Sequence, residues 1–206
     1  MGSEQDLHRT NTEKMAETRA RMLDAVLESL SERGFAATST TEVARRSGAT
    51  RGAQLHHFGT KDQMMVAAVE HLEAQIRAID VDAGFGRLTS PKERMLAALP
   101  ILSQLFSSSL GNAYVELWVA SRTHPHLVEP LRRVDQAARD VTRQLFGRAP
   151  GDVAATELDS LIDLTMHAVR GMAVDGHLAT EEERADRVAL ILGLAPYFER
   201  AIDLED

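Results

Sequence analysis

Helix start and stop signals follow one another closely in residues 39–61, STTEVARRSGATRGAQLHHFGTK. They leave this part of the chain little conformational freedom. A serine or threonine followed three residues later by glutamate or glutamine caps a helix start, because each side chain satisfies a backbone N–H that has no partner within the helix. A glycine readily takes the left-handed conformation that ends a helix. The start signals are Ser39 with Glu42, Thr50, and Thr60 with Gln63, and the stop signals are Gly48 and Gly59. This spacing predicts two short helices joined by a tight turn, with a third helix directly after them.

Two short helices joined by three or four residues form a helix-turn-helix, whose second helix can lie in the major groove of DNA. Ala44, in the middle of the first helix, favours this interpretation, because two steeply crossing helices leave room there for only a methyl group. Short turns of this kind also join helices with a purely structural role. On these signals alone, DNA binding and a structural hairpin are both open.

A longer pattern surrounds the two helices in one ungapped register. It consists of RGFAATSTT at residues 33–41, Val43-Ala44, Gly48, Gly52, His57-Phe58 and Lys61. From roughly Met15 to Ala68, the chain closely resembles the N-terminal DNA-binding domain of TetR-family transcriptional regulators. The resemblance implies a three-helix DNA-binding domain, a helical ligand-binding and dimerisation domain behind it, and repression that a small molecule releases.

The second helix departs from the family pattern at two adjacent positions. Where the family most often has an apolar residue followed by tyrosine, this chain has Gln54 and Leu55. The usual contact of a tyrosine hydroxyl with the DNA backbone is therefore absent. Leu55 can touch a thymine methyl, or it can turn inward and replace the apolar neighbour missing at Gln54. The rotation of this helix is thus open.

The resemblance implies that a homodimer places two such helices in successive major grooves of a palindromic, double-stranded operator. Phosphate contacts would position the protein, and contacts with base edges would read the sequence. The predicted phosphate contacts are Thr40, Thr41, His57 and Lys61; the predicted base-facing residues are Arg51, Ala53, Gln54, Leu55 and His56; Thr50 and Gly52 complete the predicted DNA-binding set.

Composition favours an all-α fold of about nine helices, because aromatic residues make up only 4% of the chain while alanine, leucine, glutamate and arginine dominate. The absence of cysteine excludes disulfides and thiolate metal sites. No apolar run reaches the roughly 18 residues needed to span a bilayer. We therefore expect a soluble, cytoplasmic protein without a membrane partner.

Charge is distributed unevenly along the chain. Residues 1–61 carry a formal charge of +1 and residues 62–206 carry −9, which gives the net charge of −8. The acidic side chains thus lie away from the predicted DNA-binding end. A nearly neutral DNA-binding domain implies modest non-specific affinity and dependence on specific contacts and dimerisation.

Four regions are expected. They are a mobile N-terminal tail at 1–12, the helix-turn-helix DNA-binding domain at 13–59, a connecting helix at 60–79, and a ligand-binding and dimerisation domain at 80–206. The first helix is predicted from Glu13 to Arg33, with Gly34 ending it. The helices expected in the last region cover 90–106, with a kink at Pro100, then 112–123, 126–146, 152–174 and 180–202. The connecting helix would transmit movement to the DNA-binding domain.

The helices predicted at 152–174 and 180–202 are apolar on more than one side. The additional stripes contain Leu164, Ala168 and Gly171 in one helix and Leu190, Gly193 and Tyr197 in the other. A monomer would leave these stripes in water, so we predict a two-fold, four-helix homodimer interface built from this pair of helices. The alternative is that both stripes are buried within one chain.

The helices between residues 90 and 174 are expected to enclose a cavity for a small-molecule effector of apolar or amphipathic character. Candidate lining residues are Leu102, Phe106, Tyr114, Trp118, Met166 and Met172, with Ser121, Arg122, Thr165, His167 and Arg170 as polar anchors. For each of them, a place in the ordinary core or on the surface is the alternative, because pockets and cores use the same residue types.

Catalytic and metal-binding signatures are missing. The chain has no HExxH, GxSxG, P-loop or GxGxxG motif, so neither an enzyme nor a cofactor is expected. His56 and His57 are adjacent on a helix and point about 100 degrees apart. His124 and His126 have no placed carboxylate or cysteine beside them, so no metal site is predicted. Two other classes stay open: a helical enzyme or lipid carrier that uses the hairpin as a scaffold, and a protein-binding adaptor.

Overall fold

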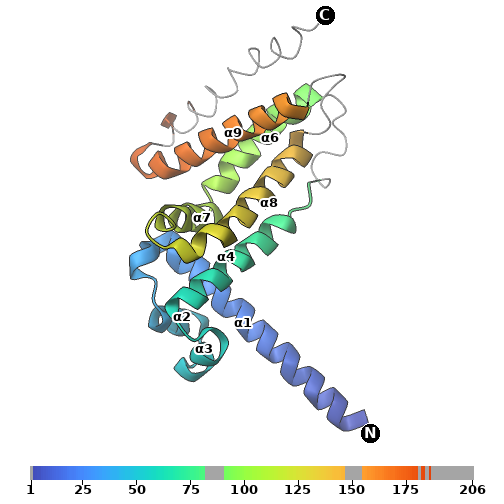
Figure 1. The fold of residues 1–206 in the computed structure, drawn as a ribbon, viewed down its shortest axis with the longest axis vertical. Helices are drawn as coiled ribbons and strands as arrows, with labels where there is room; N and C mark the ends of the chain where they lie inside the picture. The colour runs from blue at the N-terminus through green and yellow to red at the C-terminus, as the bar shows by residue number, and fades with distance from the viewer. Residues whose placement is uncertain (1, 82–90, 147–154, 181, 184–185, 187–206) are drawn as a thin grey trace, which may run out of the picture.

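The computed structural model describes residues 2–81, 91–146, 155–180, 182–183 and 186, and this part of the chain is all-helical (Figure 1). The elements are α1 (Gly2–Ala37), α2 (Thr40–Ser47), α3 (Arg51–Phe58), α4 (Lys61–Arg77), α6 (Pro91–Phe106), α7 (Ser109–Ala120), the 3-10 turn η1 (Pro125–Leu127), α8 (Val128–Phe146), α9 (Ala155–Asp175) and the 3-10 turn η2 (Gly176–Leu178). The all-α prediction is confirmed. The described residues hold eight α-helices, and most of the ninth predicted helix, at 180–202, lies outside them.

The N-terminal head, made of α1, α2 and α3, follows the predicted capping signals. Ser39 Oγ accepts the N–H of Glu42 at 3.2 Å, and Gly48 ends α2 with φ of 67°. The Glu42 carboxylate does not complete the capping box, because it binds arginine side chains of the head instead. Val43 of α2 and Phe58 of α3 are buried against α1 in a small core. The predicted boundaries of both short helices are confirmed.

Helix α1 is longer than predicted. Its backbone is helical from Gly2 rather than from Glu13, and its N-terminal part projects away from the other helices (Figure 1). Residues 3–12 contain neither glycine nor proline, so helical hydrogen bonding extends outward once it has started. The predicted stop is confirmed at Gly34, where φ of 76° and ψ of 172° interrupt the helical path. The mobility predicted for residues 1–12 stays a prediction.

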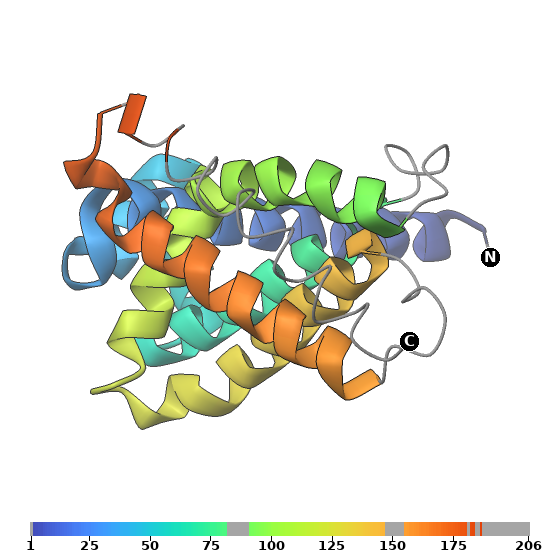
Figure 2. The ribbon, with the colours of Figure 1, turned by 90° about the horizontal axis from the view of Figure 1, so that it is seen from above.

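Helices α6, α8 and α9 lie side by side in the C-terminal part (Figures 1 and 2). Pro100 lies inside α6, as predicted. Helix α7 begins at Ser109, three residues before the predicted start at Asn112, because Ser108 Oγ caps it by accepting the Gly111 N–H at 3.2 Å. The Thr180–Glu183 capping box is present, since each backbone N–H donates to the other side chain.

One apolar core runs through both parts of the molecule. It extends from Leu23 and Val43 in the head, along Met65 and Leu72 of α4, to Leu102 of α6. Helix α4 is therefore packed into the head at one end and into the C-terminal helices at the other. The predicted domain limits at 59/60 and 79/80 stay predictions. Among the described helices, none combines the length and the hydropathy that a membrane crossing requires.

Candidate DNA-binding face and apolar cavity

The exposed side of the helix-turn-helix carries most of the predicted DNA-binding residues. Thr50 Oγ1 accepts the Ala53 N–H at 3.1 Å and so fixes the start of α3. The exposed or half-buried members of the predicted set are Thr40, Thr41, Thr50, Arg51, Gly52, Ala53, Leu55, His56 and His57. Burial lowers the pKa of His57, with smaller contributions from His56 and Arg19. On the exposed side of α3, Arg51 therefore provides a positive charge. The lowered pKa of His57 favours its neutral form.

Gln54 does not belong to this face. Its side chain is only 3% exposed, whereas Leu55 is 62% exposed. The prediction that Gln54 faces base edges is therefore wrong, and Leu55 does not turn inward. Gln54 lies four residues before Phe58, so both point from one side of α3 into the core of the head. The Gln54 amide nitrogen Nε2 is buried without a hydrogen-bond partner.

Lys61, the first residue of α4, is already engaged within the protein. Its Nζ donates to the backbone oxygens of Phe35 at 3.0 Å and Ala36 at 3.4 Å, and it lies 4.9 Å from the centre of the Phe35 ring. Burial lowers the pKa of Lys61. An ammonium has three N–H groups, so one is left for a phosphate.

Arginines of α2 are held by carboxylates of the head. Arg45 and Arg46 both donate to Glu42, and these hydrogen bonds lower the pKa of Glu42 to about 2. Arg46 also pairs with Glu32 of α1, which ties α2 to α1. These ion pairs fix the orientation of α2. They also pair the guanidinium groups of Arg45 and Arg46, which would otherwise be free to bind phosphates.

An apolar cavity lies among the C-terminal helices and α4. The space between the atoms there is about 440 Å³, which counts the solvent at its open mouth. The lining residues are Leu72, Ile76, Leu102, Leu105, Phe106, Leu110, Gly111, Tyr114, Ala138, Val141, Thr142 and Met166. Of the residues predicted from the sequence, Leu102, Phe106, Tyr114 and Met166 are among them.

The other predicted ligand-binding residues do not line this cavity. Trp118 is 41% exposed on the surface, Thr165 is buried elsewhere in the packing, and Arg122 and His167 are exposed. Ser121 Oγ donates to the backbone oxygen of Trp118 at 2.7 Å. The residues that the sequence analysis missed include Leu72 and Ile76 of α4. Their helical spacing predicts burial, but it does not say whether a buried face meets a core or a cavity.

Arg170 forms a buried polar cluster behind Tyr114 rather than a free anchor. The Tyr114 hydroxyl donates to Asp135 Oδ1 at 2.5 Å, and Arg170 Nη2 donates to Tyr114 at 2.8 Å and to Asp135 at 2.6 Å. Burial raises the pKa of Tyr114, so the hydroxyl stays protonated. The guanidinium also lies 5.0 Å from the centre of the Trp118 ring. Asp135 therefore neutralises the charge of Arg170 next to the cavity wall.

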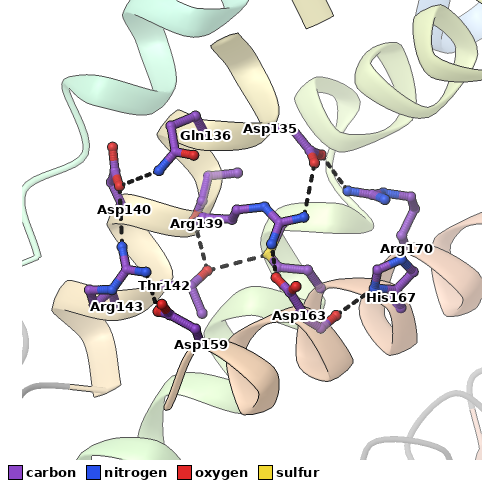
Figure 3. Close-up of polar contacts among 12 residues, drawn as sticks. Asp135, Gln136, Arg139, Asp140, Thr142, Arg143, Asp159, Asp163, His167 and Arg170 are labelled. Atoms are coloured by element: carbon purple, nitrogen blue, oxygen red, sulfur yellow. Dashed lines mark hydrogen bonds and ion pairs between the residues drawn. The ribbon is translucent and has the colours of Figure 1, made fainter. Parts of the chain in front are cut away.

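Further ion pairs join α8 to α9 along their length (Figure 3). Arg139 binds both Asp135 and Asp163, and Arg143 binds Asp140 and Asp159. His167 Nδ1 lies 2.6 Å from the backbone oxygen of Asp163. The Thr142 hydroxyl donates to the backbone oxygen of Ala138 at 2.8 Å, and its oxygen lies 3.4 Å from Met166 Sδ. Both hydroxyls in the cavity wall, those of Tyr114 and Thr142, are therefore already used within the protein.

The additional apolar stripe predicted on α9 is accessible. Leu164 is 51% exposed and Gly171 is also exposed, while Ala168 is half-buried. The partner stripe, Leu190, Gly193 and Tyr197, lies outside the described residues. Within the described part of the chain, no group of three metal-ligating side chains comes together.

Helix α3 is the exposed second helix of a helix-turn-helix, and α4 runs from it to an apolar cavity. This arrangement is typical of helix-turn-helix regulators. Residues 22–68 match the family model described as bacterial regulatory proteins of the tetR family. Residues 22–68 therefore form a DNA-binding domain of the tetR family, and the chain is a DNA-binding transcriptional regulator.

Relatives and solved structures agree with this assignment. The HTH-type transcriptional regulator CymR of Pseudomonas putida is 28% identical over 182 residues, which cover 87% of this chain and 89% of CymR. An HTH-type transcriptional regulator of Mycobacterium bovis is 32% identical over 127 residues, 61% of this chain and 64% of that protein. A TetR transcription regulator of Haloarcula marismortui has the same fold, with a TM-score of 0.67 at 16% identity, covering 90% of this chain and 98% of that structure.

Proposed function

We propose that this regulator is a repressor, and that a small apolar or amphipathic ligand releases it from a palindromic operator by entering the cavity. The observation that carries the proposal is that Leu72 and Ile76 of α4 form part of the cavity wall, while the N-terminus of α4 lies beside α3. A ligand that separates α4 from α6 or α8 would displace the recognition helix with it. No enzymatic activity is proposed, and the protein would act in the cytoplasm.

A solved structure supports a ligand in such a fold. The multidrug-binding protein EbrR, in its complex with ethidium, aligns with a TM-score of 0.62 at 18% identity, covering 86% of this chain and 98% of EbrR. The cavity of the present chain is almost wholly apolar in its lining. An apolar or amphipathic effector therefore suits it better than a sugar or a nucleotide.

The DNA contacts that we propose follow the exposed side of α2 and α3. Arg51, Ala53, Leu55 and His56 would face base edges, and Thr40, Thr41, Thr50, His57 and Lys61 would position the head on phosphates, with Gly52 allowing close approach. Dimerisation through α9 and the segment 180–202 would place two heads on the two halves of the operator.

Selection of binding sites from a random duplex library, at near-physiological salt and with excess competitor DNA, tests the proposed DNA binding. We expect enrichment of an inverted repeat, because a two-fold dimer requires a two-fold operator. A dimer in solution that enriches no sequence would contradict the proposal.

Filling the cavity tests the proposed release. Ala138→Leu adds side-chain volume to the cavity wall, so we expect it to push apart the helices that line the cavity, α4, α7 and α8 among them, as a ligand would. Operator affinity, measured by fluorescence anisotropy on the selected site, should fall about tenfold, equivalent to ~1.4 kcal/mol. Ala78→Leu, at an exposed position that does not line the cavity, is the matched control and should leave the affinity unchanged. Equal operator affinity of the two variants would contradict the proposed coupling of the cavity to DNA binding.

A further inference from the structure

Phe35, directly after the break in α1, is held by a carboxylate from another helix. Its backbone N–H donates to Glu116 Oε2 of α7 at 3.0 Å. The break exists because Gly34 adopts φ of 76°, which interrupts the hydrogen bonding of α1. A Cβ at Gly34 would lie 3.1 Å from the same Glu116 oxygen. Glycine at this position therefore provides both the backbone turn and the room for the carboxylate.

The backbone oxygen and the ring of Phe35 also contact other parts of the molecule. The Phe35 oxygen accepts Lys61 Nζ at 3.0 Å, and the Phe35 ring lies 4.6 Å from the ring of His124. Lys61 opens α4, and Gly59, the last residue before its cap, ends α3. One residue of the head thus binds α7, the start of α4, and the segment between α7 and η1.

Helix α7 presents different faces to the cavity and to Phe35. Leu110, Gly111 and Tyr114 line the cavity. Glu116 follows Tyr114 by two residues, which is about 200 degrees around the helix axis. The helix therefore lies between the cavity and the break in α1. A ligand that displaces α7 at its cavity face would displace Glu116 on its other face.

We propose that Glu116 is a positioning residue for operator binding, which fixes the end of α1 through the Phe35 N–H and couples α7 to the head. This contact forms a second path beside α4 from the cavity to the recognition helix. The inference rests on the proposed function, because it assumes that filling the cavity changes DNA binding.

Substitution of Glu116 tests the positioning role. Glu116→Ala removes the acceptor and should weaken operator binding about tenfold, whereas Glu116→Gln keeps an acceptor oxygen and should bind within about threefold of the wild type. Glu129→Ala, an exposed glutamate at the start of α8, is the control and should have no effect. Circular dichroism and dimer mass establish that each variant is folded. Unchanged operator affinity in folded Glu116→Ala would overturn the role. A tenfold loss in folded Glu116→Gln would overturn the hydrogen bond as its basis.

Amide hydrogen exchange at Phe35 tests the path from the cavity. In the dimer without DNA, Ala138→Leu should speed the exchange of this amide at least fivefold, because movement of α7 breaks its hydrogen bond. In the Glu116→Ala background the same change should add little, since the bond is already absent. If Ala138→Leu weakens operator binding but leaves Phe35 exchange unaltered, the second path is excluded while the cavity function stands. If Ala138→Leu changes Phe35 exchange but not operator affinity, the path exists and the proposed release is wrong.

Discussion

Gln54 is an amide side chain buried in the core of the head, where the family pattern most often has an apolar residue. Its Nε2 has no hydrogen-bond partner, and an unsatisfied buried polar group costs about 1–3 kcal/mol. Gln54→Leu should therefore raise the free energy of unfolding by about that amount in urea denaturation. Operator affinity should not fall, because the side chain points away from the DNA-binding face. Gln104→Leu, at an exposed site, should change stability by less than about 0.5 kcal/mol. A less stable Gln54→Leu variant would show that the amide is satisfied in solution.

The orientation of α3 and the contacts of Lys61 could not be predicted from the sequence. The adjacent pair Gln54 and Leu55 left two rotations of α3 open, because a helix of two turns has too few apolar positions to define one face. Burial of Gln54 beside Phe58 decides between them. Lys61 was predicted at a phosphate, but its contacts with the Phe35 and Ala36 oxygens join positions about 25 residues apart in the chain, and no local pattern reports them.

Helix boundaries were predictable where a cap or a terminating glycine marks them. Ser39, Gly48 and Thr60 set the limits of α2 and α4 as expected, because these signals act through bonds within a few residues. The predicted start of α7 at Asn112 was three residues late, and it left Gly111 outside the helix, whereas this glycine lies within the first turn. The reason for glycine there is packing between helices. A Cβ at Gly111 would lie 2.3 Å from the Phe106 backbone oxygen.

That close approach leads to a prediction about the junction of α6 and α7. Gly111→Ala should lower the free energy of unfolding by about 1–3 kcal/mol, because the backbone at Phe106 must move to admit a methyl group. Gly52→Ala, in the exposed helix α3, is the control: its Cβ would meet only Thr50 Oγ1, at 3.8 Å. That substitution should raise stability by about 0.5–1 kcal/mol, since alanine is the better helix former. Thermal unfolding of both variants without DNA measures the difference, and a neutral Gly111→Ala would contradict the packing.

At the scale of the whole molecule, the cavity depends on contacts between helices distant in sequence. Its wall combines Leu72 of α4, Leu102 of α6, Tyr114 of α7 and Met166 of α9. Sequence periodicity marks each of these side chains as buried, but only their assembly leaves a space among them. The neutralisation of Arg170 by Asp135 likewise joins α9 to α8, so a residue predicted as a ligand anchor serves the packing of the two helices.

The accessible stripe on α9 leads to a prediction about assembly. Leu164→Arg would place a charge in the proposed two-fold interface, opposite its own copy or its neighbours, where burial of an unpaired charge is unfavourable. The variant should sediment as a folded monomer and bind the operator at least tenfold more weakly, because one head alone reads only one half-site. Val128→Arg, at a position of 37% exposure at the start of α8, should stay dimeric. Analytical ultracentrifugation measures the oligomeric state of both variants. A dimeric Leu164→Arg variant would place the interface on another face of the molecule. Helices other than α9 would then have to set the spacing of the two heads.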